Sequence, residues 1–226
     1  LYRGKQAEEL ALHYSFEEVA YFIWNGVLPS QTELDGLVSQ MKKYRELPTY
    51  LKHLLDTLPV EMDLMSVIRT CVSAMGKENF QWKPKLEEAV LLTSLIPTII
   101  CYRYRTVNGL PIVSPHDDLG HVENYIYMLK GVLPEFAQCK ALEAYMILTM
   151  EHGMNASTFS ARVISSTESD LVSAITGAIG AMKGPLHGGA PSEVIQMLNE
   201  IGTSEQVESW LRSKLERNEK IMGFGH

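Results

Sequence analysis

Residues 15–23, Ser-Phe-Glu-Glu-Val-Ala-Tyr-Phe-Ile, carry the pattern that decides the fold class. Ser15 and Glu18 have the spacing of a capping box, in which each side chain hydrogen-bonds a free backbone N–H of the other at a helix N-terminus. The apolar residues that follow, Val19, Phe22 and Ile23 among them, recur at helical spacing. The stretch therefore predicts an amphipathic helix that begins after Ser15.

The same kind of start signal recurs along the chain. Ser30 and Glu33 form a second box, Pro48 suits the first position of a third helix, and Asp63 can cap a fourth. Further helices are expected at 121–130, 134–151, 155–165, 169–182, 190–201 and 204–218. Strand alternation is almost absent, so the sequence predicts an all-α fold.

Four further stretches refine this prediction. Residues 85–105 read as one long helix with Pro97 inside it, so we expect a kink there. Residues 134–151 are apolar nearly all round, which is typical of a helix in a core or at a subunit interface. Residues 169–182 are rich in glycine, alanine and serine, which indicates close approach of another backbone. Residues 106–118 contain Asn-Gly and two prolines and read as a loop or a small hairpin.

The composition excludes several classes of protein. The chain has 226 residues, of which 46% are apolar and 21% charged, so it is neither disordered nor a disulfide-rich scaffold. Its 20 basic and 27 acidic residues leave a net charge of −7, which does not favour a nucleic-acid or anionic-membrane surface. An anionic substrate would have to be held by local positive groups.

The cysteines and the apolar segments indicate a cytoplasmic protein. Cys71, Cys101 and Cys139 lie far apart with no CxxC pair, so we expect reduced thiols in the core. The most apolar stretch, residues 89–102, is too short and too interrupted to cross a bilayer, and we interpret it as a buried helix. The chain opens without Met and stops at His226 with no closing element, so we expect a fragment or a trimmed chain.

Three of the seven histidines stand out by their sequence context. His152 ends the apolar helix and is followed by Asn155 and Ser157, which favours the polar floor of a pocket over simple capping of its own helix. His187 lies within Gly-Pro-Leu-His-Gly-Gly directly before a predicted helix. The positive end of that helix favours a neutral imidazole, whose N–H could donate to an oxygen that gains negative charge. His226, in Gly-Phe-Gly-His, is a weak signal by itself.

The other four histidines have simpler interpretations. His13, His53 and His116 lie in polar or amphipathic surroundings and are expected to be surface or capping residues. His121 follows Gly120 at a predicted helix start, and the sequence leaves open whether it is a surface or capping residue or a functional one.

Taken together, three segments closely resemble the citrate synthase family, nearest to its shorter bacterial forms. The segments are Glu-His-Gly-Met-Asn-Ala-Ser-Thr at 151–158, Lys-Gly-Pro-Leu-His-Gly-Gly-Ala at 183–190 and Met-Gly-Phe-Gly-His at 222–226. The opening Leu-Tyr-Arg-Gly and the segment at 16–21 fit the start of that family's large domain. The resemblance covers the whole chain.

The resemblance implies an all-α enzyme that acts in the tricarboxylic acid cycle and works as a homodimer. Such an acyltransferase condenses acetyl-CoA with oxaloacetate to give citrate and CoA, and it needs no metal or other cofactor. By motif, His187 corresponds to the general acid at the thioester oxygen, His226 to the residue that polarises the ketone, and His152 to a further substrate-binding residue. The coenzyme A cradle corresponds to Leu186, Lys220, Ile221, Met222 and Gly223.

The resemblance also implies what this chain lacks. A large helical domain would comprise residues 1–183, and residues 184–226 would form the start of a small domain. The family's catalytic aspartate and its substrate-binding arginines lie beyond the Gly-Phe-Gly-His segment. Asp118 and Asp170 do not match that base, so we expect the chain alone to be inactive or nearly so. Pro191 departs from the Asn of many relatives, but proline suits a first helical turn.

Three alternatives stay open at this stage. The first is a 2-methylcitrate synthase, which uses propionyl-CoA and differs by one methyl group on the substrate. The second is a zinc centre of His152, His187 and His226, which the glycine-rich contexts and the lack of an HxxxH pair disfavour. The third is a helical scaffold without catalysis, since fold alone does not establish function.

Overall fold

The computed structural model describes residues 1–76, 81–188 and 190–221, with the backbone alone for residues 190–193. These residues form only helices, turns and loops, plus one isolated two-residue bridge, Tyr2 with Lys5. The α-helices are α1 (Ala7–His13), α2 (Phe16–Asn25), α3 (Gln31–Tyr44), α4 (Thr49–Thr57), α5 (Leu64–Ala74), α6 (Leu86–Val107), α7 (His121–Lys130), α8 (Phe136–Leu148), α9 (Ala156–Ser165), α10 (Leu171–Met182), α11 (Ala190–Ile201) and α12 (Val207–Glu216), and a 3-10 helix covers Ser204–Gln206. The all-α prediction is confirmed.

Most of the predicted helix starts are confirmed in detail. Ser15 and Ser30 both form complete capping boxes, with Glu18 and Glu33 as the partners. Asp63 caps α5 by accepting the N–H of Ser66 at 3.0 Å. The prediction for Pro48 was wrong by one position, because Pro48 has extended backbone angles and is the N-cap of α4. A residue before the helix needs no helical ψ, so proline fits there equally well.

One helix was missed and one was predicted too long. Helix α1 was missed because its N-cap, Gln6, makes no side-chain cap hydrogen bond. Helix α8 covers Phe136–Leu148 rather than 134–151, because Thr149 leaves the helical conformation and bonds back to Tyr145 and Met146 with its backbone N–H. Residues 106 and 107 end α6, and the rest of the stretch predicted as a loop or small hairpin, residues 108–118, is a loop without a hairpin.

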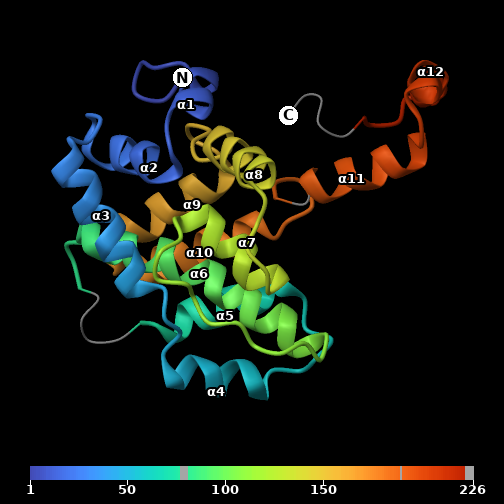
Figure 1. Cartoon of the computed structure of the whole chain (residues 1–226). Helices are drawn as coiled ribbons and strands as arrows, with labels where there is room; N and C mark the ends of the chain where they lie inside the picture. The colour runs from blue at the N-terminus through green and yellow to red at the C-terminus, as the bar shows by residue number, and fades with distance from the viewer. Residues whose placement is uncertain (77–80, 189, 222–226) are drawn as a thin grey trace.

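The helices enclose three clusters of buried apolar side chains. The largest gathers residues from α4, α5, α6 and α10, the second from α2, α3, α6, α7 and α8, and the third from α1, α2 and α8. Helix α6 contributes to two of them, and its apolar stretch at 89–102 is largely buried, as the sequence predicted. Figure 1 shows α6 among the other helices, whereas α11 and α12 extend away from the body at the upper right.

Helix α8 is not the buried helix that its composition predicted. Only Cys139 and Ile147 are buried, whereas Phe136 is 76% exposed and Tyr145 is 53% exposed. Of the two predicted locations for this helix, the core is therefore wrong for this chain, and a subunit interface stays a prediction. Since apolar residues lie nearly all round this helix, the sequence could not tell which face of the helix packs inward.

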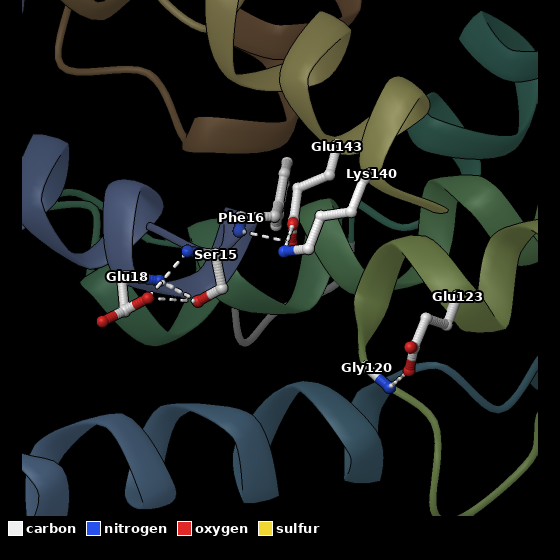
Figure 2. Close-up of polar contacts among 7 residues, drawn as sticks. All are labelled: Ser15, Phe16, Glu18, Gly120, Glu123, Lys140 and Glu143. Atoms are coloured by element: carbon white, nitrogen blue, oxygen red, sulfur yellow. Dashed lines mark hydrogen bonds and ion pairs between the residues drawn. The ribbon is translucent and has the colours of Figure 1, made fainter. Parts of the chain in front are cut away.

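Side-chain carboxylates fix the first turn of α2 against its neighbours. Glu18 accepts the N–H of Ser15 at 2.7 Å, and Glu143 on α8 accepts the N–H of Phe16 at 3.1 Å (Figure 2). Glu143 also pairs with Lys140 at 2.7 Å, as the same view shows. The N–H groups of Ser15, Phe16 and Glu18 at this helix start are thus satisfied by side chains of the protein itself.

Small residues let α9 and α10 pack closely. A Cβ added at Gly177 on α10 would lie 2.2 Å from Cδ1 of Ile164 on α9. The close approach predicted for residues 169–182 is confirmed at this position. The packing matters for the site below, because α9 begins and α10 ends beside it.

Candidate active site

The start of α9 is an unusually polar segment next to an apolar helix. Asn155 caps the helix by accepting the N–H of Thr158 at 2.9 Å. Ser157 is only 6% exposed, and its Oγ lies 2.8 Å from Oδ1 of Asn155. The first turn of α9 contains no acidic residue, so the partial positive charge of this helix end is not neutralised from within the helix.

The turn after α10 brings His187 to this helix start. The N–H of His187 donates to the carbonyl of Gly184 at 3.0 Å, and the N–H of Gly188 donates to the carbonyl of Met182 at 3.0 Å. A Cβ at Gly188 would lie 2.2 Å from that Met182 oxygen, so only glycine fits. The glycine residues around His187 thus let the chain fold back over the end of α10.

His187 contacts the buried serine directly. Its Nε2 lies 2.9 Å from Oγ of Ser157, although the two residues are 30 positions apart. The Ser157 hydroxyl has one hydrogen and two acceptors within reach, Nε2 of His187 and Oδ1 of Asn155. Where that hydrogen lies therefore sets which nitrogen of a neutral His187 ring carries its own hydrogen.

Lys183 ties the start of the same turn to α5. Its Nζ lies 2.8 Å from Oδ2 of Asp63 and 2.7 Å from Oγ of Ser66. Hydrogen bonds from Lys183 and Ser66 hold the pKa of Asp63 well below its usual range. Sequence analysis missed this contact, because Lys183 and Asp63 are 120 residues apart and no local pattern links them.

The other predicted site residues have mixed outcomes. Of the pair predicted as a polar floor, Ser157 contacts His187 and Asn155 contacts Ser157. His152 is exposed in the link between α8 and α9, and no contact among the described residues joins its ring to His187. Leu186 is 90% exposed. Of the remaining positions, Lys220 is exposed and Ile221 half-buried, whereas Met222, Gly223 and His226 lie outside the described residues.

The remaining histidines include one that is buried. His13 and His53 are exposed, as predicted. Nδ1 of His116 accepts the N–H of Asp118 at 3.2 Å. His121 is 6% exposed and stacks on Phe16 with ring centroids 4.5 Å apart, and burial lowers its pKa to about 4 with a smaller contribution from Arg45.

The zinc hypothesis finds no support in the part of the chain that the structure describes. There, no three His, Cys, Asp or Glu side chains gather as a metal site. Because His226 lies outside the described residues, the three-histidine centre itself is not tested.

No helix among the described residues is long and apolar enough to cross a membrane.

Comparisons with known proteins identify the class of this helical fold. A citrate synthase from Thermotoga maritima superposes with a TM-score of 0.87 over 99% of this chain and 60% of its own, at 44% identity. A citrate synthase from Thermoplasma acidophilum, solved with carboxymethyl coenzyme A and oxaloacetate, gives a TM-score of 0.88 at 30% identity, over 99% and 60% of the two chains. The fold is thus that of the citrate synthases.

The sequence comparisons agree with the structural ones. The family model "Citrate synthase, C-terminal domain" matches residues 1–226. The chain is 43% identical to a 2-methylcitrate synthase of Mycobacterium tuberculosis over 228 residues and 43% identical to a citrate synthase of Mycolicibacterium smegmatis over 231 residues. The two matches cover the whole of this chain, but only 58% and 61% of the length of the respective relatives. The chain belongs to the citrate synthase family.

Proposed function

We propose that this chain supplies part of the active site of a citrate synthase. The reaction joins the methyl carbon of acetyl-CoA to the ketone carbon of oxaloacetate, and water then cleaves the thioester to give citrate and free CoA. The observation that carries the proposal is the contact between His187 and Ser157 at the glycine turn. It holds an imidazole where the family motif requires a hydrogen-bond donor.

In this proposal His187 donates from Nδ1. Its Nε2 faces Ser157, so Nδ1 is the nitrogen left to meet the thioester oxygen. A neutral ring that donates from Nδ1 has a bare Nε2. In this proposal the Ser157 hydroxyl therefore turns its hydrogen from Oδ1 of Asn155, its acceptor in the structure, to Nε2 of His187. As a base removes the α-proton, negative charge grows on the thioester oxygen, and a fixed donor there stabilises the enolate by about 3–4 kcal/mol.

His226 and His152 complete the proposed substrate site by motif. His226 would polarise the oxaloacetate ketone, and His152 would bind the same substrate. The backbone at 220–223 and Leu186 would hold coenzyme A. The exposed Leu186 supports this role, because a large apolar side chain in solvent at a turn is available for a ligand. Support for oxaloacetate and a coenzyme A derivative comes from the complex of the Thermoplasma relative with oxaloacetate and carboxymethyl coenzyme A.

The proton acceptor is not among these 226 residues in the proposal, because neither Asp118 nor Asp170 matches the family's aspartate. Asp170 is occupied as the N-cap of α10, where it accepts the N–H of Ser173 at 2.9 Å. A thiol-release assay with acetyl-CoA and oxaloacetate tests this. We expect no turnover from the chain alone and turnover from a protein extended through the matching aspartate. If the extended protein is also inactive, the helical-scaffold hypothesis replaces the enzyme.

The acyl group remains a choice between two substrates. Relatives of similar identity are named citrate synthase and 2-methylcitrate synthase, and we favour acetyl-CoA over propionyl-CoA. The difference of one methylene is worth about 1–3 kcal/mol in a pocket. The ratio of kcat/KM for the two thioesters, measured on the extended protein, decides, and a ratio that favours propionyl-CoA would reassign it as a 2-methylcitrate synthase.

We also propose a homodimer and a division of the chain at residue 184. Exposed apolar side chains on α8 and α9, namely Phe136, Tyr145, Phe159 and Val163, support an interface with a second copy. The projection of α11 from the body supports a separate unit after residue 183 (Figure 1). The three cysteines are free and buried, which supports a reducing, cytoplasmic location. Analytical ultracentrifugation tests the dimer, and a monomer at micromolar concentration would contradict it.

A further inference from the structure

The turn at 183–188, which carries His187, is joined to the rest of the protein at two points. Among the described residues, its backbone hydrogen bonds run only to the turn itself and to the end of α10. The side-chain polar contacts that leave the turn come from His187, which contacts Ser157 on α9, and from Lys183, which reaches α5. The first contact belongs to the proposed active site, whereas the second serves no step of the proposed reaction.

The contact on α5 is a well-fixed point of attachment. Oδ1 of Asp63 accepts the N–H of Ser66 at 3.0 Å and caps α5, which leaves Oδ2 to bind Nζ of Lys183 at 2.8 Å. The same Nζ lies 2.7 Å from Oγ of Ser66, a residue that is only 9% exposed. Two acceptors on the first turn of α5 therefore bind one ammonium group, which fixes its position more closely than one acceptor would.

Helices α5 and α10 give this attachment a rigid base. They run antiparallel, because Lys183 joins the end of α10 to the start of α5, whereas a Cβ at Gly76, just past α5, would lie 3.7 Å from Cγ1 of Val172 at the start of α10. Val172 and Ile179 are buried in the same apolar cluster as the side chains of α5. The turn thus begins from a position that is fixed to the core.

The contact is too exposed to contribute much to global stability. The Lys183 and Asp63 side chains are 41% and 52% exposed, and exposed ion pairs add little to the free energy of unfolding. The hydrogen bond from Lys183 lowers the pKa of Asp63, so the carboxylate is ionised at neutral pH. The effect of the pair is therefore local, and the nearest functional group along the chain is His187, four residues on.

We propose that Lys183 is a positioning residue for His187, a role that rests on the proposed function of this histidine. Lys183 fixes the start of the turn and Ser157 contacts Nε2, so together they set the direction in which Nδ1 points. Lys183 acts through His187 alone, because its own ammonium group is engaged by Asp63 and Ser66. A misplaced donor slows enolate formation and leaves the other substrate contacts intact.

The substitution Lys183→Met tests this role in the protein extended through the matching aspartate. Methionine keeps an unbranched side chain but cannot bind Asp63. We expect kcat to fall about tenfold, with KM for oxaloacetate and the urea midpoint nearly unchanged. Lys140→Met removes the ion pair with Glu143 on α8 and is the control, which should keep the wild-type kcat. Equal kcat values for the two variants would overturn the proposal.

Changes at both ends of the contact distinguish positioning from a direct effect of the lysine charge. Asparagine remains a good N-cap, so Asp63→Asn keeps the start of α5 but removes the anionic partner of Lys183. The double variant with Lys183→Met should be no slower than Lys183→Met alone, because both changes break one contact. Lys183→Arg keeps a cation that can donate to the same two acceptors and should retain most of the rate. Additive losses, or Lys183→Arg as slow as Lys183→Met, would contradict the positioning role.

The His187 ring gives a readout that needs no turnover. Two-bond ¹⁵N–¹H NMR on the labelled 226-residue chain should show one ring tautomer in the wild type and in Lys140→Met, and a mixture of both tautomers in Lys183→Met. An unchanged ring in Lys183→Met would mean that Lys183 does not position His187, whatever the activity. If the ring responds as expected but the extended wild type has no turnover, the positioning contact stands and the proposed function fails.

Discussion

The N-termini of α2 and α9 are built from the same elements and are used differently. Both begin with a polar N-cap, Ser15 or Asn155, that accepts a backbone N–H three residues on. At α2 the carboxylates of Glu18 and Glu143 accept the N–H groups of Ser15 and Phe16, and Glu17 accepts the N–H of His121 at the start of α7. At α9 there is no acidic residue in the first turn.

The difference separates a structural helix start from a functional one. The α2 start is filled by the protein's own carboxylates, so it has little left to offer a ligand. The α9 start has a neutral cap and a buried hydroxyl that contacts His187. We infer that the first serves stability and the second serves catalysis, and the predictions below ask whether changes at the two sites separate in this way.

The largest effect is expected from His187→Ala at the α9 site. Loss of one fixed donor to the enolate oxygen should lower kcat of the extended protein by about 10²–10³-fold. Thermal stability should change little, because the ring is only partly buried. Steady-state thiol release measures the rate, and His53→Ala, at an exposed helix position, is the control. Equal rates for the two variants would remove His187 from the mechanism.

The next largest effect is a loss of folding stability at low pH, caused by His121 beside the α2 start. His121 stacks on Phe16, and its folded-state pKa of about 4 lies below the ordinary 6.5. The unfolded chain therefore binds a proton near pH 6.5 that the folded chain does not, and stability falls as pH drops from 6.5 towards 4, by up to about 3 kcal/mol. The raised pKa of the buried Glu17 acts in the opposite direction.

Urea unfolding of the wild type and of His121→Gln across this pH window isolates the histidine. The variant should lose less stability between pH 6.5 and 4 than the wild type. His53→Gln should follow the wild-type curve. A parallel curve for His121→Gln would mean that the buried ring does not titrate as described.

A smaller effect is expected from Ser157→Ala. The variant removes the hydroxyl that contacts Nε2 of His187 and should lower kcat by about tenfold, with KM for oxaloacetate nearly unchanged. Ser160→Ala on the same helix removes a hydroxyl that only bonds back to Ala156, so kcat should stay the same. If both serines behave alike, Ser157 is structural and the contrast between the two helix starts fails.

The smallest effects are expected from substitutions of the two N-cap residues. Ser15→Ala and Asn155→Ala should each cost about 1 kcal/mol of unfolding free energy, because each removes one cap acceptor. Only Asn155→Ala should also reduce the rate, since Asn155 lies against Ser157. Denaturant titrations and thiol release on both variants check this, and a rate loss in Ser15→Ala would contradict the structural role of α2.

Much of the helical fold could be predicted from the sequence, because helix starts are local. The boxes at Ser15 and Ser30 and the cap at Asp63 each involve residues three positions apart. Helix α1, with no capping side chain, was missed for the same reason. Whether α8 is buried could not be predicted, because an apolar helix gives no sign of which neighbours are present.

The candidate site shows the same limit. The polar residues Asn155 and Ser157 and the glycine turn at His187 could be recognised locally. The contacts that join segments could not: Ser157 with His187, Lys183 with Asp63, and Arg45 with the loop at 116–119. Each depends on packing between elements far apart in the chain. The roles of His152 and His226 rest on the family motif and stay predictions.

The state of the His187 ring is the measurement that tests this account most directly. Two-bond ¹⁵N–¹H NMR on the labelled chain near neutral pH reports which ring nitrogen carries hydrogen. We predict hydrogen on Nδ1 in the wild type, with Ser157 donating to Nε2, and hydrogen moving to Nε2 in Ser157→Ala. Hydrogen on Nε2 in the wild type would leave no donor facing the thioester and would contradict the proposed catalytic role.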